Sequence, residues 1–358
     1  MARGHGVRVV CAAEPPGPAR VDGIEVVRLP YFGKIGNTNL CPGLRRALRA
    51  ERPDVIHTHL PTAGFADQAA LASRLLGVPL VLTYNNDLTG RGLKGLLAAI
   101  YNRWLLPRLL DRARCVVVGH PGYPDHSPHL RRARSRLAVI PWGVDPAALR
   151  AAPLPPGPEL VVGFLAVLDA HHRYKGLDVL LAAAARAPQV RVRVGGAGTD
   201  LERFRRLAAR LGVAPRVEFT GFVPEPALAD FYAACHLFAL PSTDARQEGF
   251  GLVLLEAMAC GRAVVASDLA GAAPAAAAAG AGWVVPPRSA DALAAALLAA
   301  AADRGRLAEM GRRARRLVEE RYTWDRCVDD YERLFASLSS SSSNSTSWVG
   351  SIQQAKRS

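Results

Sequence analysis

The chain has 358 residues, of which 50% are hydrophobic, and its formal net charge is +14. This length predicts two or three domains, and the composition excludes a mainly disordered or fibrous chain. No apolar run reaches the ~18–20 residues that a membrane-spanning helix needs, and we expect no signal peptide after Met1. Six cysteines are scattered without metal-ligand or redox spacing, so we expect a reduced, cytoplasmic protein.

In the first half of the chain, short β-branched runs alternate with helical segments. The expected strands are Val7–Cys11, Ile24–Arg28, Val55–Thr58, Leu80–Thr83, Cys115–Val118 and Leu137–Ile140. The expected helices are Gly43–Glu51, Gly64–Leu76 and Gly92–Ala113. A doubly wound sheet normally begins with a strand and a phosphate-facing loop, and the residues before Val7 provide neither. We therefore expect this domain to lack its first strand and helix.

A segment rich in Pro, Ala and Gly at 146–158 is typical of a linker, and a second alternating series follows it. Its expected strands are Val161–Val167, Val190–Val194, Val217–Thr220, Leu237–Leu240 and Ala263–Ala266. Its expected helices are Leu177–Arg186, Asp200–Leu211, Pro226–Ala234 and Gly251–Cys260. Two such series predict two doubly wound, Rossmann-like α/β domains that face each other across a cleft. We place these domains at 1–150 and 151–322, followed by a helix at 323–338 and a disordered Ser-rich tail at 339–358.

The positive charge is concentrated in the first domain. Residues 1–150 hold 21 Lys and Arg against 10 Asp and Glu, whereas residues 151–338 hold 22 against 21. This asymmetry predicts an anionic partner for the first domain. Nucleic acid is disfavoured because no zinc finger, zipper or aromatic-interleaved basic strand is present. Residues 91–114 form a basic amphipathic stretch that contains Trp104, which suits an anionic membrane surface, or equally a helix packed on its own domain.

The segment Leu237–Gly261 combines an apolar strand, a polar loop and a helix. Glu248 precedes the helix N-terminus, and Glu256 lies about five residues into the helix, ~7–8 Å further along its axis. The free amides at 250–252 and the helix dipole favour a diphosphate there. Two flanking carboxylates suit sugar hydroxyls, which donate hydrogen bonds without carrying charge. Spacing alone favours the simpler interpretation, a capping acid and an exposed helical glutamate.

Two other turns of the second domain contain candidate binding residues. Lys175, in the sequence HHRYKG, follows the first strand of this domain and would meet a phosphate as a point charge, although it is also typical of a solvated loop cation. Gly196 and Gly198 form part of a dinucleotide fingerprint that has Leu201 in place of its third glycine. With Glu218 as a ribose-binding acid, this incomplete match leaves a nicotinamide oxidoreductase as a minor alternative.

Taken together, the blocks HRYKG, GGAG, VEFTGFVPE and LPSTDARQEGFGLVLLEAMACG resemble the family-4 glycosyltransferases with the GT-B fold. The resemblance covers roughly residues 1–338, and its most specific part is Glu248-x7-Glu256 with the residues around it. In the first domain, PDVIHTHLP (53–61), PLVLTYNND (79–87) and VIPWGVDP (139–146) look like the same family. The final helix, Trp324–Leu338, is similar to the one that crosses back onto the N-terminal domain.

This resemblance implies a retaining transferase that moves a hexose, mannose or glucose, from a nucleotide-diphosphate sugar to a glycan or lipid-linked acceptor. It implies no metal and no other cofactor, and a place in cell-envelope synthesis at the inner face of the membrane. Glu256 would hold the ribose, Glu248 the donor sugar, and Lys175 the leaving diphosphate. Other residues implied in donor binding are Phe250, Gly251, Leu252, Val223, Gly196 and Arg173. The acceptor side would include Asn86, Asp87 and His120, with Asn85 close to the reacting sugar.

Three departures from the family pattern remain. Val167 stands where relatives commonly carry an arginine, Asn85 stands where they often carry a histidine, and the first strand with its Gly-rich loop is not found. These departures leave a catalytically silent sugar-nucleotide-binding protein as an alternative. His57 and His59 also suggest zinc, but without a third ligand we expect them to be buried strand histidines.

Overall fold

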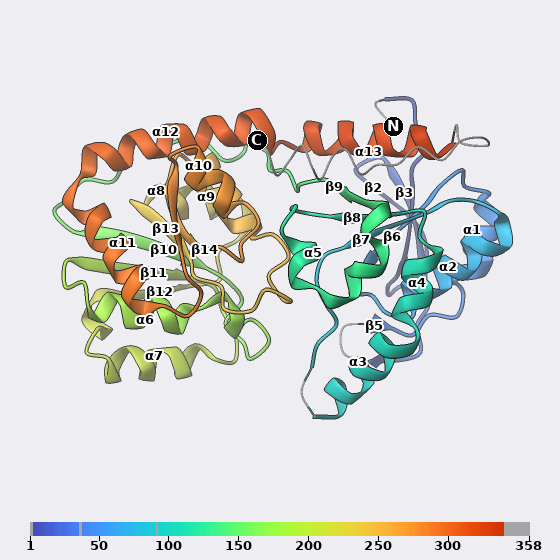
Figure 1. Ribbon diagram of the computed structural model, residues 1–358, viewed down its shortest axis with the longest axis horizontal. Coiled ribbons are helices and arrows are strands. Elements are labelled where there is room, and N and C mark those ends of the chain that lie inside the picture. The colour runs from blue at the N-terminus through green and yellow to red at the C-terminus, as the bar shows by residue number, and fades with distance from the viewer. Residues whose placement is uncertain (1–2, 36–37, 91, 340–358) are drawn as a thin grey trace. The chain divides into compact units, whose positions relative to one another are not determined.

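The computed structural model describes residues 3–35, 38–90 and 92–339 (Figure 1). Contacts divide the chain into unit 1, Met1–Val139 with Glu332–Ser358, and unit 2, Ile140–Tyr331. Unit 2 begins about ten residues before the expected boundary at 150, because Val144 already bridges to Thr323 and both Val144 and Leu149 belong to a core cluster of unit 2. The expected disordered tail lies outside the described residues, except for Ser339, which ends a helix.

Unit 1 contains two larger sheets and a small hairpin. Its strands are β1 (Arg8–Ala12), β2 (Gly17–Val21), β3 (Ile24–Leu29), β4 (Lys34–Ile35), β5 (Thr38–Asn39), β6 (Ile56–Leu60), β7 (Leu80–Tyr84), β8 (Cys115–Val118) and β9 (Leu137–Val139). Its helices are α1 (Leu44–Glu51), α2 (Phe65–Leu76), α3 (Gly92–Trp104), α4 (Leu106–Arg112) and α5 (Tyr123–His126). One sheet has the order β1-β3-β2 and the other the order β6-β7-β8-β9, and β4 pairs with β5.

The six strands expected in unit 1 are present, but they do not form one sheet. β1 and β3 are parallel in the three-stranded sheet, whereas β6 to β9 form a separate parallel sheet. β2, which pairs antiparallel with β3, was not among the expected strands. β2 lies at a sheet edge, where Pro18 is tolerated although it lacks a backbone N–H. The expected lack of an earlier strand and helix stays a prediction.

The expected helix at 92–113 is two helices instead. α3 ends at Trp104 and α4 begins at Leu106. Pro107 explains the break, because it has no N–H to donate to the carbonyl of Arg103 and its ring clashes with that turn. Buried residues of α4, such as Leu106, Leu109 and Leu110, pack in the core of unit 1.

Unit 2 is a single doubly wound domain, as expected. Its strands are β10 (Leu160–Leu165), β11 (Val190–Gly195), β12 (Val217–Gly221), β13 (Leu237–Leu240), β14 (Ala263–Ser267) and β15 (Gly282–Val285). Its helices are α6 (Leu177–Ala185), α7 (Leu201–Arg210), α8 (Leu228–Ala233), α9 (Leu252–Ala259), α10 (Ala273–Ala278), α11 (Ala290–Ala302), α12 (Arg304–Arg321) and the first residues of α13 (Trp324–Ser339). The strands are parallel, in the order β12-β11-β10-β13-β14-β15.

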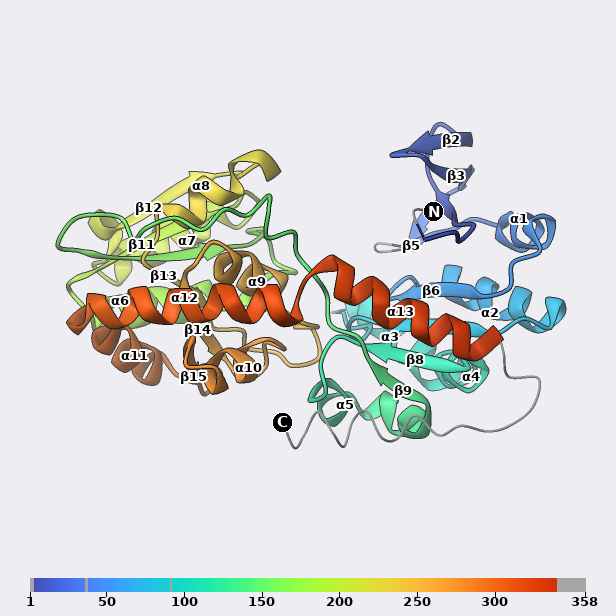
Figure 2. The same cartoon turned by 90° about the horizontal axis from the view of Figure 1, so that it is seen from above.

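Helices cover both faces of this sheet. One core cluster joins α6, α7 and α11 to β10 and β11, and the other joins α8, α9, α10 and α12 to β13 and β14 (Figure 1). Figure 2 shows α12 lying beside α9, which it contacts. The strand order reverses between β10 and β13. In doubly wound sheets, the carboxyl ends of the strands at such a reversal form the usual ligand-binding position.

Candidate active site

Three side chains meet at the carboxyl ends of β10 and β13. The Lys175 ammonium, in the turn between β10 and α6, lies 2.9 and 3.1 Å from the two carboxylate oxygens of Glu248. Glu248 lies in the loop after β13 and is only 1% exposed. The hydroxyl of Ser242, in the same loop, donates to a Glu248 oxygen at 2.6 Å. The structure therefore brings Lys175 and Glu248 into direct contact, and Ser242 joins them.

Tyr174 is the second neighbour of the Lys175 ammonium. The ammonium lies 5.2 Å from the centre of the Tyr174 ring and also bonds to its hydroxyl. Burial lowers the pKa of Lys175, but Glu248 and Tyr174 more than offset this, so its pKa is raised. Lys175 is therefore a fixed, permanently charged cation at neutral pH, which suits the stabilisation of a leaving anion.

Glu256 lies in the middle of α9 and is held by a buried tyrosine of α8. The Tyr232 hydroxyl donates to a Glu256 oxygen at 2.5 Å, and Tyr232 is fully buried. Burial raises the pKa of Glu256, the Tyr232 hydrogen bond opposes this rise, and the charge of Glu225 adds to it. The simpler interpretation of Glu256 as an exposed helical residue is therefore wrong: its carboxylate is partly buried and held in one orientation.

The N-terminus of α9 provides the expected group of backbone donors. Phe250 is buried, Gly251 precedes the helix, and Leu252 is its first residue. Gly251 has φ +84°, and a Cβ there would lie 2.9 Å from the Leu240 side chain, so only glycine fits this entry into the helix. The first amides of α9 have no intrahelical acceptor and suit an anion.

The other expected donor residues surround the same strand ends. The Gly196 amide, after β11, donates to the Gly221 carbonyl at the end of β12, at 2.7 Å, and the half-buried Val223 follows β12. The Arg173 guanidinium makes a two-point contact with Asp200, so its charge is already paired. Val167 is 51% exposed in the loop after β10. A donor role for these residues stays a prediction.

The expected acceptor-side residues belong to unit 1. Asn85 donates from its side chain to the Leu60 carbonyl at 2.9 Å, and Asn86 follows it, half-buried. Asp87 is buried and accepts hydrogen bonds from Tyr84 and Ser127 at 2.8 and 2.7 Å. This group therefore lies at the carboxyl end of β7.

His120, the fourth expected acceptor-side residue, follows β8. It is 5% exposed, and its Nε2 has no hydrogen-bond partner among the described residues. Burial, helped by the charge of His126, lowers the pKa of His120 to about 4. The neutral ring packs edge-on against Tyr123, with the ring centres 5.7 Å apart. Because Nε2 is buried, an acceptor-side role for His120 stays a prediction.

His57 and His59 stack on each other in β6, with ring centres 4.5 Å apart. His57 bonds to Thr83 at 2.7 Å, and burial together with the charge of His59 lowers its pKa to about 3. Within the described part of the chain, no three His, Cys, Asp or Glu residues are placed to hold a metal ion. Both histidines were expected to be buried, but His57 is half-buried and His59 is exposed.

The minor alternative of a nicotinamide site depended on Glu218 as the ribose ligand. Glu218 instead pairs with Arg193 across β11 and β12 at 2.7 Å, on an exposed part of the sheet. The Glu218 carboxylate therefore already forms an ion pair with an arginine of the neighbouring strand β11.

Helix α3 turns its apolar side outward. Five large apolar side chains at helical spacing are exposed: Leu93, Leu96, Leu97, Ile100 and Trp104. Tyr101 is buried on another side of the helix, and Lys94 and Arg103 flank the apolar side. We call these five residues the α3 apolar face. These five side chains do not pack on their own unit. The interpretation of residues 91–114 as a helix packed on its own domain therefore does not hold for this face. No helix of the described ranges has the length and apolar character to cross a bilayer.

Three contacts could not be foreseen from sequence. Ser242 carries no distinguishing signal beyond its position after a strand. Tyr174 was read only as part of HRYKG, and Tyr232 lies 24 residues before its partner Glu256. Such partners are defined by packing between elements rather than by spacing along the chain.

The two Rossmann-like units, with a cation and a buried carboxylate beside a helix N-terminus, define the GT-B class of transferases. Solved structures support this fold. Sucrose-phosphate synthase from Thermosynechococcus elongatus aligns with a TM-score of 0.74 at 23% identity, covering 94% of this chain and 90% of that one. Anabaena Alr3699/HepE, in complex with UDP, aligns with a TM-score of 0.69 at 23% identity, covering 88% and 87%.

The chain belongs to the glycosyl transferases group 1 family and is a glycosyltransferase. That family description matches residues 147–317, and a glycosyl transferase 4-like domain matches residues 1–143. The chain is 31% identical to a phosphatidyl-myo-inositol mannosyltransferase of Mycolicibacterium smegmatis over 94% of its own length and 86% of the relative's. It is 32% identical to a D-inositol 3-phosphate glycosyltransferase of Gordonia bronchialis, over 80% and 67%. An O-antigen chain mannosyltransferase C of Escherichia coli is 29% identical, over 81% and 77%.

Proposed function

We propose that this protein transfers a hexose, mannose or glucose, from a nucleotide-diphosphate sugar to a lipid-linked or membrane-proximal acceptor, with retention of configuration. The observation that carries this proposal is the buried contact of Lys175 with Glu248 beside the N-terminus of α9. A cation and a row of free amides suit the diphosphate, and the carboxylate suits a sugar hydroxyl.

In this proposal, the charge that develops on the departing diphosphate is stabilised by Lys175 and by the amides of Phe250, Gly251 and Leu252. Because these groups are fixed before the donor arrives, they need little reorganisation during the reaction. Glu248 accepts hydrogen bonds from the donor sugar, and Glu256 from the ribose. Val223, Gly196 and Arg173 complete the donor side, and the acceptor approaches Asn85, Asn86, Asp87 and His120. The reaction needs no metal in this scheme, because Lys175, which is paired with Glu248 in the structure, acts together with the α9 amides on the diphosphate.

The names of two relatives support a hexose as the transferred sugar and an inositol or a lipid as the acceptor. One relative is a mannosyltransferase of phosphatidyl-myo-inositol, and another is a glycosyltransferase of inositol 3-phosphate. The α3 apolar face supports an acceptor at a membrane, since basic residues beside exposed Leu, Ile and Trp suit anionic lipid. We therefore propose a cytoplasmic enzyme that works at the inner face of the membrane, in cell-envelope glycan or glycolipid synthesis.

Transfer is tested with the purified full chain and a panel of nucleotide sugars, including GDP-mannose and UDP-glucose. The acceptors are phosphatidylinositol vesicles and inositol 3-phosphate. We expect release of nucleoside diphosphate and an α-linked product by NMR, and loss of both in Glu248→Gln. Donor binding without turnover by any pair would favour the alternative of a silent sugar-nucleotide-binding protein. No binding of any donor would reject both.

Membrane association is tested separately by vesicle sedimentation. We expect the chain to bind vesicles that contain phosphatidylglycerol, and Leu93→Glu with Ile100→Glu to weaken this binding at least about tenfold. Leu71→Glu with Leu75→Glu is the matched control, because Leu71 and Leu75 are 40% and 70% exposed on α2 and lie outside the α3 apolar face. Equal binding by all three proteins would remove the face from the proposal but leave the transfer reaction untouched.

A further inference from the structure

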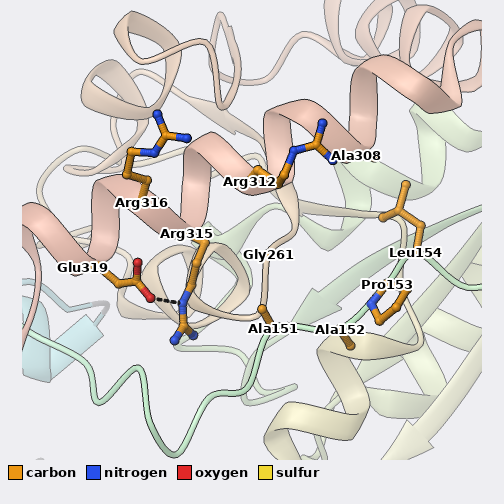
Figure 3. Close-up of a pocket in the computed structure, with 11 residues that line it drawn as sticks. Ala151, Ala152, Pro153, Leu154, Gly261, Ala308, Arg312, Arg315, Arg316 and Glu319 are labelled. Carbon is orange, nitrogen blue, oxygen red and sulfur yellow. Dashed lines mark hydrogen bonds and ion pairs between the residues drawn. The ribbon is translucent and has the colours of Figure 1, made fainter.

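A cavity of about 310 Å³ lies in unit 2, away from the residues assigned to the donor (Figure 3). Its walls are the chain segment 151–154, Gly261 and one side of α12. Gly261 follows the C-terminal end of α9, whereas the donor site lies at the N-terminal end of that helix. The eight residues of α9 separate the two positions by ~12 Å along the helix axis.

The walls of this cavity are held rigidly. Arg262 is fully buried, and its guanidinium donates to the carbonyls of Pro153 and Cys235 at 3.2 and 3.1 Å, and also to that of Ala152. On the other side, α12 approaches so closely that a Cβ on Gly311 would lie 2.1 Å from the Gly261 carbonyl oxygen. The segment 151–154 and α12 are therefore fixed relative to each other, so the cavity is formed before any ligand binds.

The lining carries an excess of positive charge. Arg312, Arg315 and Arg316 project from α12, and the lining contains one acid, Glu319 (Figure 3). The Arg315 guanidinium already has partners within the protein. It pairs with Glu319 at 2.6 Å and donates to the Leu149 carbonyl at 2.6 Å. The other two guanidinium groups of the lining have no carboxylate partner within it.

Those two groups are Arg312 and Arg316, one helical turn apart on α12. Both are exposed at the cavity. Arg312 donates through Nε and Nη2 to one carboxylate oxygen of the exposed Glu309, at 2.9 and 2.5 Å, an ion pair that contributes little to stability at a surface. No ion pair of Arg316 occurs among the described residues. Residues at i and i+4 lie ~6 Å apart, a spacing at which two guanidinium groups can bind one phosphate.

The rest of the lining is apolar. Ala151, Ala152, Pro153, Leu154 and Ala308 offer no charged group to a ligand. The volume is at the lower end of small-molecule sites and accommodates a short organic body with one phosphate. We propose that this cavity binds a small phosphate monoester, with the phosphate between Arg312 and Arg316 and the organic part against segment 151–154. This second site goes beyond the proposed transfer reaction and does not depend on it.

The test uses the full chain and glycerol 3-phosphate as the probe, with glycerol as its uncharged counterpart. Binding is measured by calorimetry and by the shift in thermal unfolding. We expect glycerol 3-phosphate, but not glycerol, to bind and to raise the unfolding temperature. In Arg312→Gln with Arg316→Gln, the dissociation constant should rise at least about tenfold, because two charge-assisted hydrogen-bonding groups are lost.

Two controls separate this site from other sources of phosphate binding. Arg205→Gln with Arg206→Gln removes the same charge from an exposed side of α7 and should bind as the parent does. A saturating concentration of UDP, added to occupy the donor site, should leave the affinity of the parent for glycerol 3-phosphate unchanged. Unchanged affinity in the Arg312 and Arg316 variant, loss in either control, or no binding by the parent would each overturn the proposal.

Discussion

The hydroxyl of Ser242 lies 2.6 Å from the Glu248 carboxylate oxygen that also lies 2.9 Å from the Lys175 ammonium. Ser242 and Glu248 are both buried, so neither partner of this carboxylate is readily replaced by water. Glu248 is therefore oriented by two donors from different elements, the loop after β13 and the turn before α6. A single fixed orientation is what the proposed role of Glu248 toward the donor sugar requires.

We predict that Ser242→Ala lowers kcat/KM for transfer about tenfold, because Glu248 loses a hydrogen bond that fixes its orientation. Ser267→Ala is the matched control, since Ser267 is equally buried and its hydroxyl has no partner among the described residues. Steady-state kinetics of both variants with the same donor provide the measurement. Equal losses in the two variants would mean that Ser242 contributes only to folding.

We predict that Lys175→Met destabilises the chain by about 3–5 kcal/mol, because it leaves Glu248 buried without a counter-charge. Glu248→Gln in the same chain should restore much of that loss, since no uncompensated charge remains. Chemical denaturation of the parent, both single variants and the double variant gives the coupling between the two residues. Additive losses would contradict a direct ion pair. Transfer should be absent in the double variant even where its stability recovers.

We predict that Tyr232→Phe weakens donor binding about tenfold at neutral pH. Burial already raises the pKa of Glu256, and loss of the Tyr232 hydrogen bond would raise it further. Because the ribose hydroxyls need an ionised acceptor, donor affinity should be lost at a higher pH in the variant as the solution is acidified. Calorimetric titration with the donor across the acid range measures this. Coinciding pH profiles for parent and variant would show that Tyr232 does not act through Glu256.

The sequence was most informative where spacing within one segment determines the geometry. Strands β8 and β13 have the predicted bounds, and Glu248 and Glu256 lie before and within α9 as expected. These features depend on local hydrophobic period and on helix-end chemistry, which are both local properties of a chain.

Other features depend on contacts between distant segments and were not predictable. Spacing alone favoured an exposed Glu256, yet Tyr232 and the surrounding helices partly bury it. β2 was missed because Gly17 and Pro18 weaken its strand pattern, and only its pairing with β3 defines it. The outward direction of the α3 apolar face was also undetermined, since an amphipathic pattern indicates two faces but not which of them meets the core.

We predict that acidification destabilises the chain through its buried histidines. Burial lowers the pKa of His120 to about 4, while an unfolded histidine titrates near 6.5. The unfolded chain therefore takes up protons first, so the stabilising contribution is complete above pH ~6.5 and is lost as the pH falls towards 4. For His120 the loss amounts to about 2 kcal/mol at pH ~5.

The pKa of His236 is also lowered, and the hydrogen bonds of its ring favour the neutral form. Its Nδ1 accepts from the Val161 amide at 3.1 Å and its Nε2 therefore donates to the Pro155 carbonyl at 2.9 Å, an arrangement that requires the neutral ring. Burial, with the charge of Arg304, lowers its pKa to about 4. Thermal unfolding of the parent and of His120→Asn between pH 7 and 5 tests the prediction. The parent should lose more stability on acidification than the variant, and parallel losses would show that His120 is not protonated on unfolding in this range.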